Sequence, residues 1–161
     1  MKKPTVCELN LRKADRRDSV FLLSVRNLPE VRAQSKTQAV ITESMHATWF
    51  DAQLNNPGVG IWILEHRGQS EGYVRAQETT SGRWLLSVAL QTSSQGKGHG
   101  TWAIREGCRI LQEQYGARCI VAEVLARNAV ARRLFQSTGF VEKGMEREQG
   151  LDVVRFELTR T

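Results

Sequence analysis

Three glycines alternate with other residues in the segment 95–100, which has the form Gln-x-x-Gly-x-Gly. Glycine tolerates positive φ angles and lets the main chain approach a phosphate closely. The segment follows an apolar run at 84–90, typical of a strand, and precedes a helical pattern at 100–115. The unpaired N–H groups and the positive dipole end of a helix start attract anions. The sequence therefore predicts a phosphate-binding loop between a strand and a helix.

Two other phosphate-binding motifs fit this segment poorly. A P-loop needs Gly-x-x-x-x-Gly-Lys-[Ser/Thr], but here Lys97 is followed by Gly98 and no glycine stands five positions before Gly96. A Rossmann fingerprint needs Gly-x-Gly-x-x-Gly in a β-α-β series, whereas this chain has Gly-x-Gly-x-Gly, although Glu123 is suitably placed for a ribose. A glycine-rich helix entry without a ligand remains an alternative, because short glycine motifs are weak signals.

A second motif follows a short apolar run at 119–125. Asn128 is a favourable helix N-cap, and Gly139 suits the left-handed position just after the helix end. Ala131, Leu134 and Phe135 share one face of the helix between them. The pattern predicts a strand, a short helix and a further strand.

Together, the motif Gln-x-x-Gly-x-Gly and the downstream motif Asn-x-x-Ala-x-x-Leu-Phe-x-x-x-Gly-Phe resemble the GNAT superfamily of N-acetyltransferases, which use acetyl-CoA as co-substrate. The resemblance covers residues 84–140 and implies a mixed α/β fold of about seven strands and about four helices, in a single domain 1–161. It implies that main-chain amides of the loop hold the CoA pyrophosphate, that the preceding strand pairs with the pantetheine arm, and that the downstream Asn contacts the cofactor near its thiol. The cofactor residues implied are Val88, Leu90, Gln95, Gly96, Lys97, Gly98, His99, Gly100 and Asn128.

Hydrophobic periodicity and turn residues give the remaining elements. Strands are expected at 5–11, 60–65, 72–78, 84–90, 118–125, 141–147 and 153–159. Helices are expected at 15–27, at 42–54 with Thr42 as N-cap, at 100–115, and after Asn128. Residues 67–70 should join one hairpin, and Gln149 with Gly150 the last one. Helices should cover both faces of the sheet.

Composition limits the class of protein. With 161 residues, 40% hydrophobic and 25% charged, the chain is expected to form one globular domain. The net charge of +6 suits an anionic small molecule, and without a basic run no nucleic acid is expected. No apolar stretch is long enough for a membrane span and no signal peptide is evident, so a cytoplasmic protein is expected. Cys7, Cys108 and Cys119 are expected to be buried free thiols, no metal-ligand spacing is present, and a homodimer would be typical of the resemblance.

Glu123 is the candidate general base, because it interrupts the apolar run at 119–125. Its context resembles the ribosomal-protein N-acetyltransferase branch, where a Glu at this place acts as base and a Tyr twelve residues later assists. That position holds Phe135, so the expected phenol is missing. The resemblance implies an oxyanion donor among the N–H groups of residues 88–90. A structural carboxylate at Glu123 and a core aromatic at Phe135 are the alternatives, and other candidate bases are His46, His66 and Glu78.

Candidate acceptor-binding residues stand in the N-terminal third: Arg26, Asn27, Arg32, His46 and Trp49. With Phe50, they resemble the sugar-nucleotide N-acetyltransferases of the pseudaminic acid pathway, which implies the primary amine of an amino-sugar nucleotide as acceptor. A similar layout occurs in aminoglycoside, polyamine and protein N-terminal acetyltransferases. Two alternatives remain open. Trp49 and Phe50 could belong to the core with Arg26 and Arg32 on the surface, or the protein could be a module that senses acyl-CoA without turnover.

Overall fold

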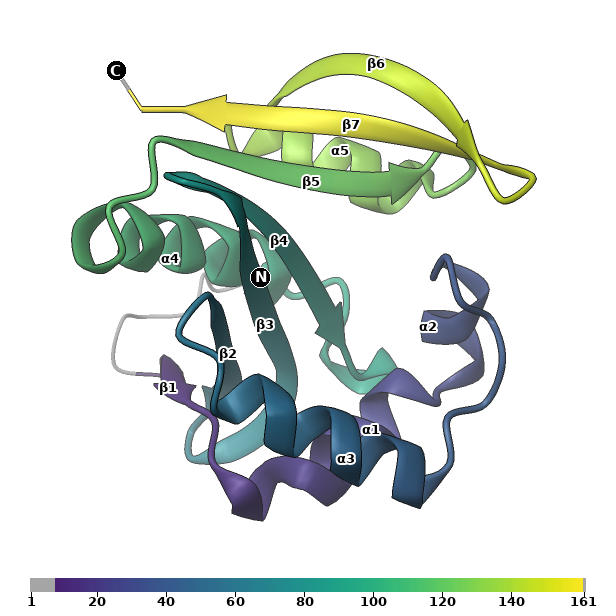
Figure 1. The fold of residues 1–161 in the computed structure, drawn as a ribbon, viewed down its shortest axis with the longest axis vertical. Coiled ribbons are helices and arrows are strands. Elements are labelled where there is room, and N and C mark those ends of the chain that lie inside the picture. Colours follow the sequence, from purple (N-terminus) through teal and green to yellow (C-terminus); the bar gives the residue numbers. More distant parts are fainter. Residues whose placement is uncertain (1–7, 161) are drawn as a thin grey trace.

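A computed structural model describes residues 8–160 of the chain and shows one seven-stranded sheet with helices on both faces (Figure 1). The strands are β1 (Leu9–Lys13), β2 (Val59–His66), β3 (Gln69–Thr80), β4 (Arg83–Leu90), β5 (Cys119–Leu125), β6 (Val141–Glu148) and β7 (Leu151–Thr159). The helices are α1 (Ser19–Arg26), α2 (Pro29–Ala33), α3 (Glu43–Leu54), α4 (His99–Gln114) and α5 (Ala129–Ser137), with 3-10 turns at Arg16–Asp18 and Thr92–Ser94. The mixed α/β fold expected from the sequence is confirmed.

The sheet has the strand order β1-β2-β3-β4-β5-β7-β6 and divides at its centre. All neighbouring strands are antiparallel except β4 and β5, which α4 connects as a parallel pair. These two strands pair only at Arg83–Cys119, Trp84–Ile120 and Leu85–Val121. Beyond Leu85 and Val121 they diverge, so that β1–β4 and β5–β7 form two half-sheets joined at one end (Figure 1).

The larger core lies between the sheet and α4. The helix expected at 100–115 carries an apolar stripe there, in which Ile104, Cys108 and Leu111 are buried. Tyr115 continues the stripe and packs edge-on against two tryptophan rings of the sheet, Trp62 and Trp84. Burial of this apolar surface is the main favourable contribution to stability.

A second core lies on the opposite face of the sheet, under α1 and α3. It joins Leu22 and Phe50 of these helices to Ile61 and Ile63 of β2. Helices therefore cover both faces of the β1–β4 half. No helix among residues 8–160 has the length and apolar composition of a membrane-spanning helix.

Local signals in the sequence identified two helix caps and one hairpin turn correctly. Thr42 Oγ1 accepts a hydrogen bond from the Met45 N–H at 3.2 Å, and Asn128 Oδ1 accepts one from the Ala131 N–H at 3.1 Å, so both predicted N-caps are confirmed. Gln149 and Gly150 both have positive φ, as a two-residue hairpin turn requires.

Three details differ from the sequence prediction. The helix expected at 15–27 starts as a 3-10 turn that Asp15 caps, and α1 begins only at Ser19. A short helix that was not expected, α2, follows with Pro29 in its first turn, where the missing N–H costs nothing, so the described residues form five helices and not about four. The first strand is Leu9–Lys13, and the part expected at 5–7 lies outside the described residues.

The described cysteines differ in burial. Cys108 is buried, and its burial raises the pKa of the thiol to about 12. Cys119 is only half-buried and accepts a hydrogen bond from Arg83 Nη1 at 3.4 Å, which corrects the expectation of full burial. Both are free thiols, and Cys7 lies outside the described residues.

Candidate active site

The glycines of the loop before α4 serve two different purposes. Gly96 and Gly98 have φ of +77° and +83°, and a Cβ at either would meet no atom within 4 Å. These two glycines are therefore required by backbone conformation, and the space above them is open. Gly100 is helical, and a Cβ there would lie 3.2 Å from the side chains of Leu90 and Leu134, so close packing requires this glycine.

The main-chain N–H groups of the loop are available to an anion. Within the described chain, those from Gly96 to Thr101 make no hydrogen bond, and the first helical bond runs from the Trp102 N–H to the Gly98 carbonyl at 3.2 Å. They stand at the positive end of the 16-residue helix α4. Unpaired amides at the start of a helix are what an anion-binding loop needs, and anion binding at this loop stays a prediction.

Side chains of the loop contribute unequally. Lys97 is exposed and adds positive charge beside the amides, and Gln95 Nε2 donates to the Leu90 carbonyl at 3.4 Å, which ties the loop to the end of β4. The His99 imidazole is buried instead, with Nδ1 2.5 Å from Glu71 Oε2 and its ring 4.7 Å from that of His66. His99 can therefore offer a main-chain N–H to the cofactor, but not its side chain.

The same histidine belongs to a cluster that residue spacing did not reveal. Ligand atoms of His66, Glu71 and His99 lie within 4.8 Å of one another, close enough to share a metal ion. The three residues come from β2, β3 and α4, so no local sequence motif indicates that they lie together.

The divergence of β4 from β5 exposes main-chain groups beside the loop. Val88 and Leu90 lie past the last strand pair and are half-buried against the α4 core. Asn128 stands just beyond the end of β5, and its Nδ2 makes no hydrogen bond with a described residue. The structure thus brings together the end of β4, the start of α4 and the helix α5 that Asn128 caps, since Leu90 and Leu134 both approach Gly100.

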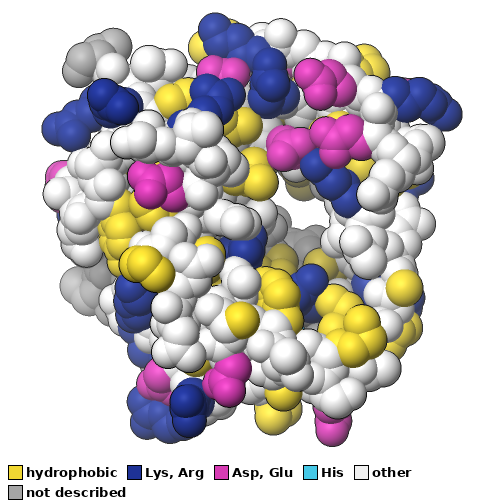
Figure 2. All heavy atoms as spheres, in the orientation of Figure 1, with side chains coloured by type: hydrophobic (Ala, Val, Ile, Leu, Met, Phe, Trp, Pro, Cys, Tyr) yellow, Lys and Arg dark blue, Asp and Glu magenta, His cyan; other side chains and the backbone are white. Residues whose placement is uncertain are grey.

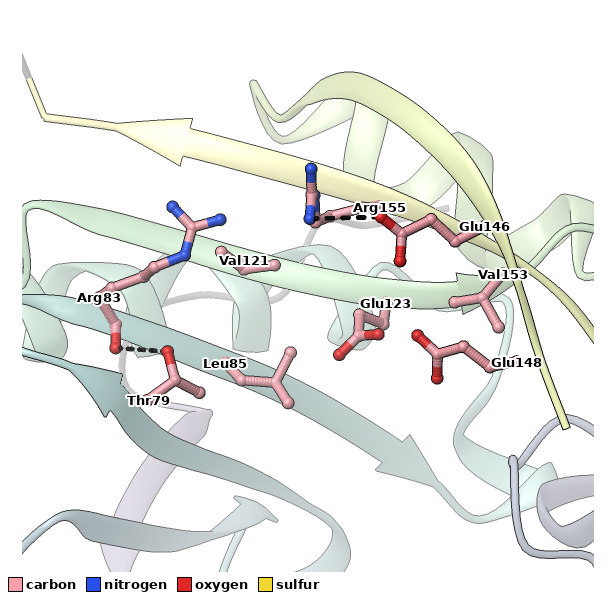
Figure 3. Close-up of a pocket in the computed structure, with 9 residues that line it drawn as sticks. All are labelled: Thr79, Arg83, Leu85, Val121, Glu123, Glu146, Glu148, Val153 and Arg155. Atoms are coloured by element: carbon pink, nitrogen blue, oxygen red, sulfur yellow. Dashed lines mark hydrogen bonds and ion pairs between the residues drawn. The ribbon is translucent and has the colours of Figure 1, made fainter.

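A cavity of about 250 Å³ lies on the face of the sheet opposite α4 and α5, across β4, β5, β6 and β7. Figure 3 shows the side chains of Glu123 and Glu148 extending toward one another within it. The cavity is lined by Thr79, Arg83, Leu85, Val121, Glu123, Glu146, Glu148, Val153 and Arg155. Its lining is therefore rich in charge.

Glu123 is half-buried in this cavity and is not isolated. Lys36 Nζ lies 2.8 Å from Glu123 Oε2 and 2.7 Å from Glu148 Oε2, so one ammonium joins the two carboxylates. The hydrogen bond from Lys36 lowers the pKa of Glu148. Glu78, another candidate base, accepts a bond from the Gly82 N–H in the β3–β4 turn, at the other end of β4.

Phe135 lies in the core. Its ring is 5.1 Å from that of Phe140, nearly perpendicular, and 6.1 Å from that of Phe156, nearly parallel. Only 6% of the residue is exposed. Leu134 is the residue of α5 that reaches Gly100 and the end of β4. The placement agrees with the core alternative for Phe135.

Two arginines gather around Trp49, of which sequence reasoning found one. The guanidinium carbons of Arg26 and Arg75 lie 4.5 and 5.4 Å from the centroid of the same ring, from α1 and β3. Arg75 donates to the neutral amides of Gln53 and Gln77, and its buried Nε has no partner. Burial, with the nearby charge of Arg26, lowers the pKa of Arg75. Neither arginine forms an ion pair with a described residue.

The other candidate acceptor residues are engaged in the fold. Asn27 exchanges two hydrogen bonds with the main chain of Ile41, at 2.8 and 2.9 Å, and Arg32 Nε donates to the Asn27 carbonyl at 3.2 Å. His46 is 1% exposed and stacks on Phe50, and burial lowers the pKa of its imidazole. These three residues shape the segment that carries Arg26 and Trp49.

The space-filling view shows a deep opening between the two halves of the molecule (Figure 2). Acidic side chains gather above it, over the β5–β7 half, and basic side chains lie within it. A ligand in this opening would meet both signs of charge.

Solved structures share this architecture. Spermidine N-acetyltransferase from Vibrio cholerae, in complex with CoA and spermine, has a TM-score of 0.87 and 18% identity, covering 95% of this chain and 96% of that one. RimL, a ribosomal L7/L12 α-N-protein acetyltransferase in complex with CoA, has a TM-score of 0.84 and 14% identity, with 97% and 96% covered. Aminoglycoside acetyltransferase AAC(6')-Ib, in complex with CoA, has a TM-score of 0.82 and 20% identity, with 94% and 95% covered.

Sequence comparison gives the family independently. Searching the curated proteins gave no significant match. The model of the acetyltransferase (GNAT) domain, in contrast, matches residues 8–141, which include the glycine loop, the divergent strands and Asn128. Because this match spans most of the chain and the fold agrees with it, the protein belongs to the GNAT acetyltransferase family.

Proposed function

We propose that the protein transfers the acetyl group of acetyl-CoA to a primary amine by direct attack in a ternary complex. One observation carries the proposal: the strands diverge after Leu85 and Val121, beside a loop whose amides from Gly96 to Thr101 are free to bind an anion. A pyrophosphate on the loop would let the pantetheine arm follow β4 past Val88 and Leu90, toward Asn128. The thioester would then lie in the opening between the strands.

The chemistry needs few groups. A neutral amine attacks the thioester carbonyl, and an N–H of β4 between residues 88 and 90 would stabilise the oxyanion. Glu123, on the neighbouring strand, would accept the proton of the amine. A thiol with a pKa of about 8.5 leaves adequately as thiolate, so the reaction does not depend on a phenol at the position of Phe135.

For the acceptor we propose the amine of an amino-sugar nucleotide. Arg26 and Arg75 support an anionic acceptor, because both are half-buried, lie close together and have no ion-pair partner among the described residues, so a ligand could supply the opposite charge. Guanidinium groups suit phosphates, which they can bind through two hydrogen bonds. Both guanidinium groups lie close to the half-buried Trp49 ring, and the exposed part of this ring would contact a sugar.

A polycationic acceptor is the second candidate. The carboxylates of Glu123, Glu146 and Glu148 line the cavity and favour it. The named activities of the similar structures, on spermidine, on a ribosomal protein and on aminoglycosides, belong to this class or to protein N-termini. A module that binds acyl-CoA without turnover is the remaining alternative.

Release of free CoA thiol from acetyl-CoA, measured with a panel of amines, tests the proposal. The panel contains amino-sugar nucleotides, aminoglycosides, polyamines and N-terminal peptides. We expect turnover with an amino-sugar nucleotide, and Arg26→Ala and Trp49→Ala should raise its KM while the affinity for acetyl-CoA stays constant. Faster turnover of polyamines would favour a polycationic acceptor. Binding of acetyl-CoA without turnover of any amine would favour a module that senses acyl-CoA.

A further inference from the structure

The segment 29–36, which contains α2, bridges the two half-sheets at the point where β4 and β5 end (Figure 1). Glu30 accepts a hydrogen bond from Thr92, which follows β4. The carbonyl of Ala33 accepts one from Arg127, which follows β5. The segment is therefore held on both sides of the opening, and Lys36 is its last residue.

Lys36 places an alkyl ammonium group between the carboxylates of Glu123 and Glu148. The contacts of 2.8 and 2.7 Å are those of charge-assisted hydrogen bonds. The two carboxylates belong to different strands, β5 and β6, so the fold has brought together two acceptors that suit one ammonium.

The other charges of the cavity are already paired. Arg83 lies 3.1 Å from Glu157, and Arg155 lies 3.5 Å from Glu157 and 3.9 Å from Glu146. Among the residues that the structure describes, Lys36 is thus the single cation in contact with Glu123 and Glu148. Without it, the two carboxylates would face one another at a site open to amines.

We propose that Glu123 and Glu148 form the ammonium subsite of the acceptor, and that Lys36 is an internal competitor for this subsite. This inference rests on the proposed acetyl transfer to an amine, and it identifies Lys36 as the side chain that occupies the acceptor subsite. The ligand class is a protonated primary alkylamine, which is what the lysine side chain itself presents.

Lys36 acts here as an occupant and not as an acceptor. Burial favours the neutral amine, but the hydrogen bonds to Glu123 and Glu148 outweigh this effect and raise the pKa of Lys36. The side chain is therefore held as an ammonium, which has no lone pair for attack on a thioester. Glu123 can receive a proton from an acceptor only after Lys36 has left.

The contact is weak enough to be displaced. The Lys36 side chain is 40% exposed, and partly exposed ion pairs contribute little to stability. Removal of the competitor should therefore improve binding of an alkylammonium by about two- to fivefold. Loss of one carboxylate should weaken binding by a similar factor.

The test uses n-butylammonium as a probe, with binding to the full chain followed by NMR titration. Lys36→Met removes the ammonium and keeps the length, and should lower the Kd of the probe about two- to fivefold. Glu148→Gln should raise the Kd. Lys143→Met, at an exposed position of β6, is the control and should change nothing.

Binding of the probe does not require turnover, so the result is independent of whether an acceptor has been found. An unchanged Kd in both Lys36→Met and Glu148→Gln, with melting temperatures like that of the parent, would overturn the subsite. Mass spectrometry after incubation with acetyl-CoA gives a second criterion. An unmodified Lys36 agrees with a competitor, whereas stoichiometric acetylation of Lys36 would make it an acceptor and overturn the assignment.

Discussion

Leu85 of β4 and Val121 of β5 form the last pair between these parallel strands, and Glu123 lies two residues beyond it on β5. The candidate base therefore stands at the fork where β4 loses its neighbour. Main-chain groups of β4 and the carboxylate of Glu123 therefore border the same gap between the two strands. The register of one short ladder thus places two groups of the proposed chemistry.

Gly98→Asp should weaken acetyl-CoA binding at least about tenfold, since it puts a negative charge beside the amides that favour anions. Calorimetry with the folded variant measures this. Gly68→Asp is a matched control, because Gly68 has a similar φ of +80° and a Cβ there also meets no atom within 4 Å. Both variants should lose similar stability, and only Gly98→Asp should lose affinity. Equal affinities in the two variants would rule out cofactor binding at the loop.

Glu123→Gln should lower turnover roughly 10²- to 10⁴-fold, the usual contribution of a positioned base. The deficit should shrink at high pH, where more of the amine is already neutral. Glu146→Gln is the control, because Glu146 lines the same cavity but lies near Arg155. Activity of Glu123→Gln within a few-fold of the parent across pH would move the role of base to another group or to water.

Phe135→Tyr should lower the melting temperature without faster turnover. The ring is packed between Phe140 and Phe156, and an unpartnered phenol in such a place costs about 1–3 kcal/mol. Phe21→Tyr is a suitable comparison, because Phe21 is half-buried and its added hydroxyl can reach water. An unchanged melting temperature together with faster turnover would instead place the Phe135 ring at the thiol end of the cofactor channel.

His46 should make stability depend on pH. Burial lowers the pKa of its imidazole, so between the lowered value and the ordinary value of 6.5 the unfolded chain binds a proton that the folded protein does not. Stability therefore falls as the pH decreases through this window. His46→Leu should show a smaller fall in melting temperature between pH 7.5 and 5.5 than the parent does. Parallel pH profiles of the two proteins would show that His46 does not titrate differently on folding.

Sequence reasoning succeeded where the signal is local. The caps Thr42 and Asn128 and the glycine loop each depend on a few neighbouring residues, and each was found. The helix α2 was not expected, because five residues are too few to show a helical period.

Residues that only the tertiary fold brings together could not be found from local signals in the sequence. Lys36 and Glu123 are 87 residues apart in the sequence and contact one another only in the folded protein. Arg75 belongs to the Trp49 cluster because strand alternation turns it toward α3, and that face is known only once the register is known. The side chain of His99 points away from the loop for a similar reason, since its partner Glu71 lies on another strand.

The ladder of three residue pairs between β4 and β5 also has a consequence for motion. Between these two strands, the described main chain is joined by few hydrogen bonds, whereas within each half-sheet the ladders are long. Parts of a protein that share few bonds open at different free energies, and amide hydrogen exchange measures this separately for each part. We expect the amides of β2 and β3 to exchange only when the whole protein unfolds. Those near Leu85 should exchange through a smaller, local opening between the half-sheets. A cofactor that touches both half-sheets would slow that exchange.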